Sequence, residues 1–72
     1  MNLESRMLSH VPLLEGEERL KSMHLQNNEI GKIENLVSLP NLNFLDFSLN
    51  RLHDISSLSS VPSLRVLMLG RN

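Results

Sequence analysis

The side chains that could carry out catalysis in this 72-residue chain are few and poorly placed for it. Its three histidines are His10, His24 and His53, and no two of them have the sequence spacing of a metal-binding pair. Ser48, His53 and Asp54 supply the residue types of a hydrolytic triad, yet no nucleophile elbow and no glycine-rich oxyanion loop accompanies them. Because such residue types occur together in most proteins, the pattern predicts no enzyme and no metal site.

The carboxylates and glycines offer no alternative site. Glu34 is expected in a turn, and a short acidic run that reads as a solvated surface comprises Glu15, Glu17 and Glu18. The three glycines are isolated from one another, so no loop could cradle a phosphate. We therefore expect no cofactor.

The charge balance and the apolar runs argue against two classes of partner. The chain has seven basic and eight acidic residues, which gives a net charge of -1. This balance predicts no basic surface for nucleic acid or an anionic membrane. The longest apolar run, residues 66–69, is far shorter than the roughly 18 residues of a membrane span. No apolar stretch of a secretory signal occurs near the start, so a cytoplasmic location is expected.

A 22-residue interval organises the chain. Four sets of residues recur at this interval, namely Leu20, Leu42 and Leu64; Met23, Leu45 and Leu67; Leu25, Phe47 and Leu69; and Asn28, Asn50 and Asn72. Projected back by 22 residues, the apolar register continues at Met1, Leu3, Leu8, Val11 and Leu14, with Arg6 in the asparagine position. This predicts one domain, 1–72, with a degenerate first repeat (1–19), two full repeats (20–41 and 42–63) and an incomplete one (64–72).

Each repeat is expected to contain one short strand and no long helix. Apolar and polar residues alternate over 23–25 and 45–47, the pattern of a strand with one buried face. The following segments space their apolar residues three apart, which favours tight turns and short 3₁₀ pieces. Pro40 and Pro62 then limit any helical continuation.

The stretches "LKSMHLQNNEIGKIENLVSLPN" and "LNFLDFSLNRLHDISSLSSVPS" resemble the LxxLxLxxN unit of leucine-rich-repeat proteins, in the 22-residue subclass typified by a regulatory subunit of protein phosphatase 1. The resemblance covers nearly the whole chain. It implies an α/β fold, a right-handed solenoid with parallel β-strands on its concave face and short 3₁₀ or turn segments on its convex face. Stacking of successive units would make one continuous apolar core.

The recurring asparagines have a physical reason to stand where each strand ends. A chain that turns inward there would leave backbone carbonyls buried, and an amide side chain can both donate and accept hydrogen bonds. Asn28, Asn50 and Asn72 are therefore expected to form a structural ladder. The alternative is that each is simply a turn residue.

In leucine-rich repeats, the residues between the buried leucines face outward from the concave sheet and usually contact partners. Carried onto this sequence, the resemblance predicts a protein-binding set of His24, Gln26, Phe44, Asp46, Ser48, Val66, Met68 and Arg71. Phe44, Leu49, Val66 and Met68 would form an apolar patch with a polar rim, which is typical of an interaction surface. Alternatively, Phe44 and Val66 pack against the edge of the core.

The chain stops directly after a strand, so we expect a fragment of a longer array, with Leu64, Leu67 and Leu69 facing water and weakly cooperative unfolding. The opening "LESRMLSHVPLLEGEERLKSMHLQNNEIGKIENL" is similar to the leucine-rich-repeat subunit of the neuronal tubulin polyglutamylase complex, a family also called leucine-rich repeat-containing protein 49. That resemblance implies a non-catalytic scaffold that binds a protein partner in a tubulin-modifying or axonemal complex, at the cytoskeleton or cilium. The alternatives are a regulatory subunit docking on a protein phosphatase, or targeting repeats attached to an enzyme.

Overall fold

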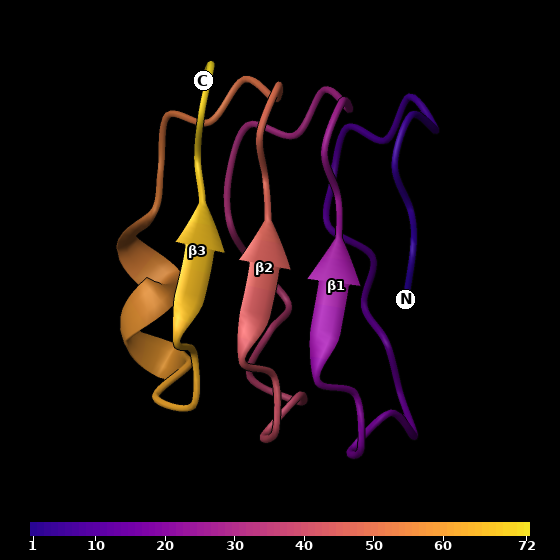
Figure 1. The fold of residues 1–72 in the computed structure, drawn as a ribbon, viewed down its shortest axis with the longest axis vertical. Helices are drawn as coiled ribbons and strands as arrows, with labels where there is room; N and C mark the ends of the chain where they lie inside the picture. Colours follow the sequence, from indigo (N-terminus) through magenta and orange to yellow (C-terminus); the bar gives the residue numbers. More distant parts are fainter.

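Three short parallel strands lie side by side in the computed structural model, which describes residues 1–72. They are β1 (Ser22–His24), β2 (Phe44–Asp46) and β3 (Val66–Met68), and they form one sheet in the order β1-β2-β3 (Figure 1). The register pairs Ser22 with Phe44 and Phe44 with Val66, so neighbouring strands are offset by the 22-residue interval. Each interval is one coil of the chain.

The strands begin and end one residue earlier than predicted, but the predicted residues still take part in the pairing. The Leu25 N–H donates to the Asp46 carbonyl at 2.9 Å, and the Phe47 N–H donates to the Met68 carbonyl at 2.8 Å. The central residues Met23 and Leu45 are fully buried, and their neighbours within β1 and β2 are half-buried. The period-2 alternation therefore describes these strands correctly.

The first coil runs beside β1 without forming a regular strand. The His24 N–H donates to the Met1 carbonyl at 2.9 Å, and the Leu3 N–H donates to the His24 carbonyl at 2.8 Å. Val11, in the register of Ile33, is buried at 1% exposure, whereas Met1, in the register of the buried Met23, is 38% exposed. Register alone therefore does not set burial in this coil.

The core lies between the sheet and the return segments, by which we mean residues 29–43 and 51–65. Its buried apolar members are Val11, Met23, Leu25, Ile30, Ile33, Leu36, Leu39, Leu42, Leu45, Phe47 and Val61. The last coil adds Leu64, Leu67 and Leu69, which are half-buried against this core instead of fully exposed to water. Apolar burial of this kind is the main stabilising contribution, at about 1.5–3 kcal/mol for each large side chain.

The return segments contain no α-helix and a single 3₁₀ helix, η1 (Ser56–Ser60). The equivalent stretch of the preceding coil consists of turns, so the prediction of a short 3₁₀ piece holds in one coil only. Asn35 explains the difference, because its φ of 62° is left-handed and interrupts a helical turn at the position that Ser57 occupies inside η1. The predicted α/β fold is therefore present as parallel strands connected mostly by turns, with one 3₁₀ helix.

Candidate functional site

The outer face of the sheet carries the residues predicted to bind a partner. Phe44 is half-buried, and its ring is tilted by 43° against the ring of His24, with centroids 5.1 Å apart. Val66 and Met68 are 47% and 46% exposed. Phe44 therefore partly packs against a neighbour, whereas the two β3 residues remain open to solvent.

Leu49 extends the apolar surface beyond the end of β2. It is 44% exposed and has a φ of 58°, in the left-handed region that a leucine rarely adopts. The same conformation recurs 22 residues apart at Ser5, Asn27 and Arg71, so the repeat imposes it. A bulky apolar residue kept in a strained and exposed position points to a role outside folding. We refer to Phe44, Leu49, Val66 and Met68 as the sheet-face patch.

The polar members of the predicted set lie around this patch. The Asp46 carboxylate accepts a hydrogen bond from the Ser48 backbone N–H at 2.9 Å. The Gln26 side chain donates to the Glu4 carboxylate at 3.3 Å, while its own Oε1 is buried without a hydrogen-bond partner. Arg71 is exposed and makes no ion pair. The sheet register aligns His24 with Asp46 and Asp46 with Met68, whereas Arg71 lies beyond the end of β3.

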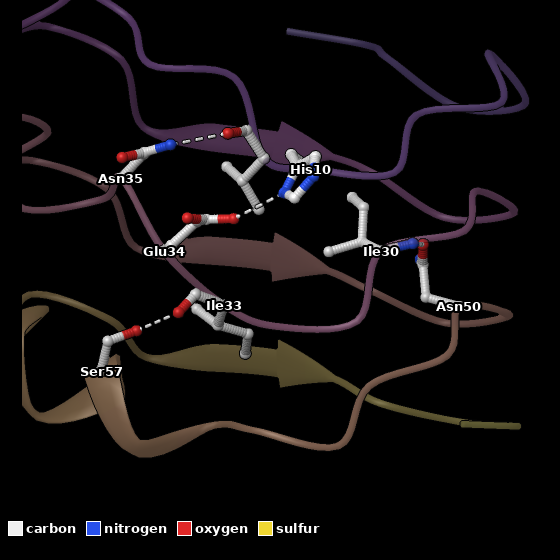
Figure 2. Close-up of polar contacts among 8 residues, drawn as sticks. His10, Ile30, Ile33, Glu34, Asn35, Asn50 and Ser57 are labelled. Carbon is white, nitrogen blue, oxygen red and sulfur yellow. Dashed lines mark hydrogen bonds and ion pairs between the residues drawn. The ribbon is translucent and has the colours of Figure 1, made fainter.

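The recurring asparagines connect successive coils through their side chains. Asn50 is 7% exposed, accepts a hydrogen bond from the Ile30 N–H at 3.0 Å (Figure 2), and donates to the Leu25 and Phe47 carbonyls at 2.8 and 3.0 Å. Asn28 donates to Leu3 and Leu25 in the same way, and Asn72 to Phe47 and Leu69. Each asparagine thus bonds to its own coil and to the preceding one.

A second set of polar side chains joins the coils on the return side, and the sequence reasoning missed it. Asn35 donates to the Val11 carbonyl at 2.8 Å, and the Ser57 hydroxyl donates to the Ile33 carbonyl (Figure 2). Asn35 and Ser57 are themselves 22 residues apart. The recurrence of a hydrogen-bonding side chain at the 22-residue interval was the sequence signal that could have predicted these bonds between coils.

The return side also holds a polar cleft of about 350 Å³. Its lining contains no apolar residue and consists of Ser9, His10, Glu29, Gly31, Lys32, Glu34 and His53. Glu34 was predicted only as a turn residue, but its carboxylate lies 3.3 Å from His10 Nδ1 (Figure 2). The structure thus brings two histidines to one cleft, although no group of three or more His, Cys, Asp or Glu side chains could hold a metal ion.

The residue types of a hydrolytic triad do not form a triad. Ser48 follows β2, whereas His53 lines the return-side cleft, and no hydrogen bond joins either residue to the other. Asp54 is engaged differently: hydrogen bonds from the backbone N–H and the hydroxyl of Ser56, at 3.0 and 2.7 Å, lower the pKa of its carboxyl. The positive charge of Lys32 adds a smaller effect in the same direction.

Comparison with known families agrees with this architecture. Residues 18–60 match the family model described as leucine-rich repeats in two copies, and the chain belongs to the leucine-rich-repeat family. Leucine-rich repeats are generally non-catalytic modules that bind proteins, and the parallel three-stranded sheet is consistent with their stacked coils. No helix is long and apolar enough to cross a membrane.

The chain is also similar to a curated human protein of the same family. The chain is 39% identical over 61 residues to leucine-rich repeat-containing protein 49 of Homo sapiens, which confirms the resemblance noted from the sequence. The matched region is 85% of this chain but only 9% of the relative's length. No solved structure matches the chain significantly.

Proposed function

We propose that this chain binds a protein partner through the outer face of its sheet. The observation that carries the proposal is the sheet-face patch, in which Val66 and Met68 are almost half exposed and Leu49 keeps a strained backbone conformation. Exposed apolar residues on a regular sheet with a polar rim are typical of interaction surfaces. The coils behind the sheet hold these side chains at fixed spacing, which lowers the entropy lost on binding.

The size of the patch limits what it can do alone. Completing the burial of half-exposed side chains such as Val66 and Met68 contributes roughly 1 kcal/mol each, so the whole patch contributes about 3–4 kcal/mol. A micromolar complex requires about 8 kcal/mol. The partner must therefore also contact polar neighbours of the patch, among which His24 and Asp46 lie in the same register.

The return side is a weaker candidate for the same role. Its cleft has no apolar lining residue, and two of the carboxylates there are already engaged, Glu34 with His10 and Glu29 with Arg51 at 3.3 and 3.8 Å. An exposed ion pair such as Glu29–Arg51 contributes about 0–1 kcal/mol. A second cleft on the return side, of about 390 Å³, has four apolar lining residues among polar ones. Two of them, Val37 and Leu13, are 76% and 64% exposed and provide a direct comparison with the patch.

For the wider setting, the proposal is a non-catalytic scaffold in a microtubule- or cilium-associated complex in the cytoplasm, built as a section of a right-handed solenoid. Its support is the 39% identity to the human leucine-rich-repeat relative together with the resemblance of the opening segment to a tubulin polyglutamylase subunit. A solenoid that continues past β3 would also cover Ile55, which is 47% exposed although its equivalents Val11 and Ile33 are buried.

A pull-down from ciliated or neuronal extract tests the proposal. The full-length wild-type protein is compared with a Phe44→Glu, Met68→Glu variant and with a matched Leu13→Glu, Val37→Glu variant on the return side, after circular dichroism has shown all three to be folded. Captured proteins are identified by mass spectrometry. We expect a tubulin-modifying or axonemal protein to be lost from the sheet-face variant only.

Equal capture by the sheet-face variant would show that the partner binds elsewhere. Recovery of a protein phosphatase in place of cytoskeletal proteins would support the regulatory-subunit alternative.

A further inference from the structure

Asp46 is a half-buried carboxylate on the sheet face that has no cationic partner. It lies on β2, the middle strand of the sheet (Figure 1), and its Oδ1 accepts the Ser48 N–H at 2.9 Å. Its Oδ2 makes no hydrogen bond, and neither oxygen forms an ion pair. Of its two neighbours in register, Met68 carries no charge, and His24 packs its ring against Phe44 without pairing with the carboxylate. Asp46 therefore depends on water for its remaining hydrogen bonds.

No lysine or arginine stands at an outward position of the strands. These positions alternate with the buried Met23 and Leu45 and are Ser22, His24, Phe44, Asp46, Val66 and Met68. Lys21 and Arg65 precede β1 and β3 in the alternation of the buried residues, and Arg71 lies in a left-handed turn beyond β3. None of these three cations forms an ion pair. The only full charge at an outward strand position is therefore the Asp46 carboxylate.

Apolar groups border this carboxylate on two sides. Phe44 lies two residues earlier on the same side of β2, and Met68, which is 46% exposed, lies opposite on β3. Adjacent strands are about 4.8 Å apart and alternate residues on a strand about 6.6 Å apart, so one long side chain can reach all three. Lysine and arginine have an apolar stem and a charged head, which matches this combination of groups.

We propose that the partner places a lysine or arginine side chain on Asp46, with its apolar stem against Met68 and Phe44. This inference rests on the proposed function, because it names the chemistry by which the partner docks on the same face. A partner that covers the sheet-face patch also removes the Asp46 carboxylate from water, and a buried carboxylate without a donor is strongly unfavourable. A cation at Oδ2 replaces the lost water with a charge-assisted hydrogen bond. Asp46 therefore selects a partner that is basic at this point and rejects one that is apolar or acidic there.

The test is a titration of the ¹⁵N-labelled full chain with three blocked pentapeptides, followed by amide chemical shifts. In LSRSF the arginine lies between two apolar residues on one side of an extended peptide. The second peptide replaces this arginine with citrulline, its uncharged isostere. The third, LRSSF, has the composition of LSRSF but directs the arginine away from the apolar residues, so it measures the general attraction of a chain with a net charge of -1 for a cation.

The expected result is a preference for LSRSF that depends on charge. We expect LSRSF to bind about three- to tenfold more tightly than either control peptide, because a partly exposed ion pair contributes modestly. Its largest shifts should fall on residues 44–48 and 66–68. Added salt should reduce the preference, since the ion pair is not fully buried.

Matched variants assign the preference to its source. Asp46→Asn removes the charge but keeps an oxygen for the Ser48 N–H, so its urea midpoint should stay close to that of the wild type. This variant should bind LSRSF and the citrulline peptide equally. Glu15→Gln removes the same charge from an exposed position in the first coil and should leave the preference unchanged.

Three results would overturn the basic anchor while leaving a sheet-face partner in place. They are equal binding of LSRSF and either control peptide by the wild-type chain, a preference that persists in Asp46→Asn, and no shift with any peptide at millimolar concentration. Shifts confined to the return side would overturn both the basic anchor and the proposed function.

Discussion

Replacing Asn50 with alanine is the sharpest test of how the coils are held together. The Asn50 side chain is 7% exposed and makes hydrogen bonds to four residues in two coils. Its Oδ1 is the acceptor for the Ile30 N–H, and its Nδ2 donates to the Leu25, Phe47 and Ser48 carbonyls. The substitution removes all of these bonds without changing the apolar core.

The loss of stability in the Asn50→Ala variant depends on which hydrogen-bond partners remain for the groups that Asn50 contacts. The Leu25 carbonyl keeps the Asn28 donor at 3.0 Å, and the Phe47 carbonyl keeps the Asn72 donor at 2.9 Å. The Ile30 N–H keeps no partner, and a buried donor without one costs about 1–3 kcal/mol. The Ser48 carbonyl keeps the Asn27 N–H at 2.9 Å. With a smaller loss at these three carbonyls, we expect Asn50→Ala to cost about 2–3 kcal/mol and to lower Tm by about 10–20 °C.

Urea unfolding followed by far-ultraviolet circular dichroism measures the loss as a shift of the midpoint at constant m value. Asn72→Ala is the matched control, because Asn72 is exposed and its bond to the Leu52 N–H is open to solvent, so its cost should stay below about 1 kcal/mol. Equal losses for the two variants, or an unchanged midpoint for Asn50→Ala, would refute the view that buried bonding by the asparagine joins the coils.

Three further outcomes follow from single positions. Leu49→Asn should stabilise the fold by about 1 kcal/mol, since asparagine tolerates the left-handed φ of 58°, and should weaken partner binding, as a urea midpoint and a binding curve will show. Gly31→Ala should change stability by less than about 1 kcal/mol, because the added Cβ meets only the tip of the exposed His53 ring, at 2.8 Å; a large midpoint shift would contradict this. The pKa of the Asp54 carboxyl is lowered in the folded state from its ordinary value of 3.8. The stability that the ionised carboxylate contributes to the fold is therefore complete above pH 3.8 and is lost as the pH falls through the folded-state pKa. In an NMR titration, Ser56→Ala should raise this pKa only partway, because the hydrogen bond from the Ser56 backbone N–H remains.

The sheet was predictable because the 22-residue interval acts directly on strand pairing. A column such as Met23 and Leu45 must stack to bury its apolar side chains, and stacking sets the register to 22 residues. Alignment did not fix burial in the first coil, where Val11 is 1% exposed and Met1 is 38% exposed although both keep the register. Periodicity predicts which residues align, whereas burial is decided by the packing around each one.

Side-chain contacts on the return side were harder to predict because they do not join residues 22 positions apart. Asn35 bonds to Val11 and His10 meets Glu34 across 24 residues, two more than the repeat interval. The backbones there keep the 22-residue register, as the Lys32–Asp54 bridge shows, so these side chains reach two residues beyond their register partners. A search at 22 residues therefore pairs His10 with Lys32 instead of Glu34. The exposure of the sheet-face patch could not be predicted from the sequence either. The same alternation of apolar and polar residues allows Phe44 to pack against the edge of the core or to project into solvent.

The distribution of inter-coil hydrogen bonds explains why partner binding can reside on the sheet. Side chains that join the coils come from positions outside the strands, such as Asn50 after β2 and Ser57 in η1. The outward side chains of the strands, including Phe44 and Met68, make no hydrogen bond to another coil. Substitutions at the outward positions can therefore change which partner is recognised while the bonds between coils remain intact. This separation allows one repeat framework to present different surfaces without losing its fold.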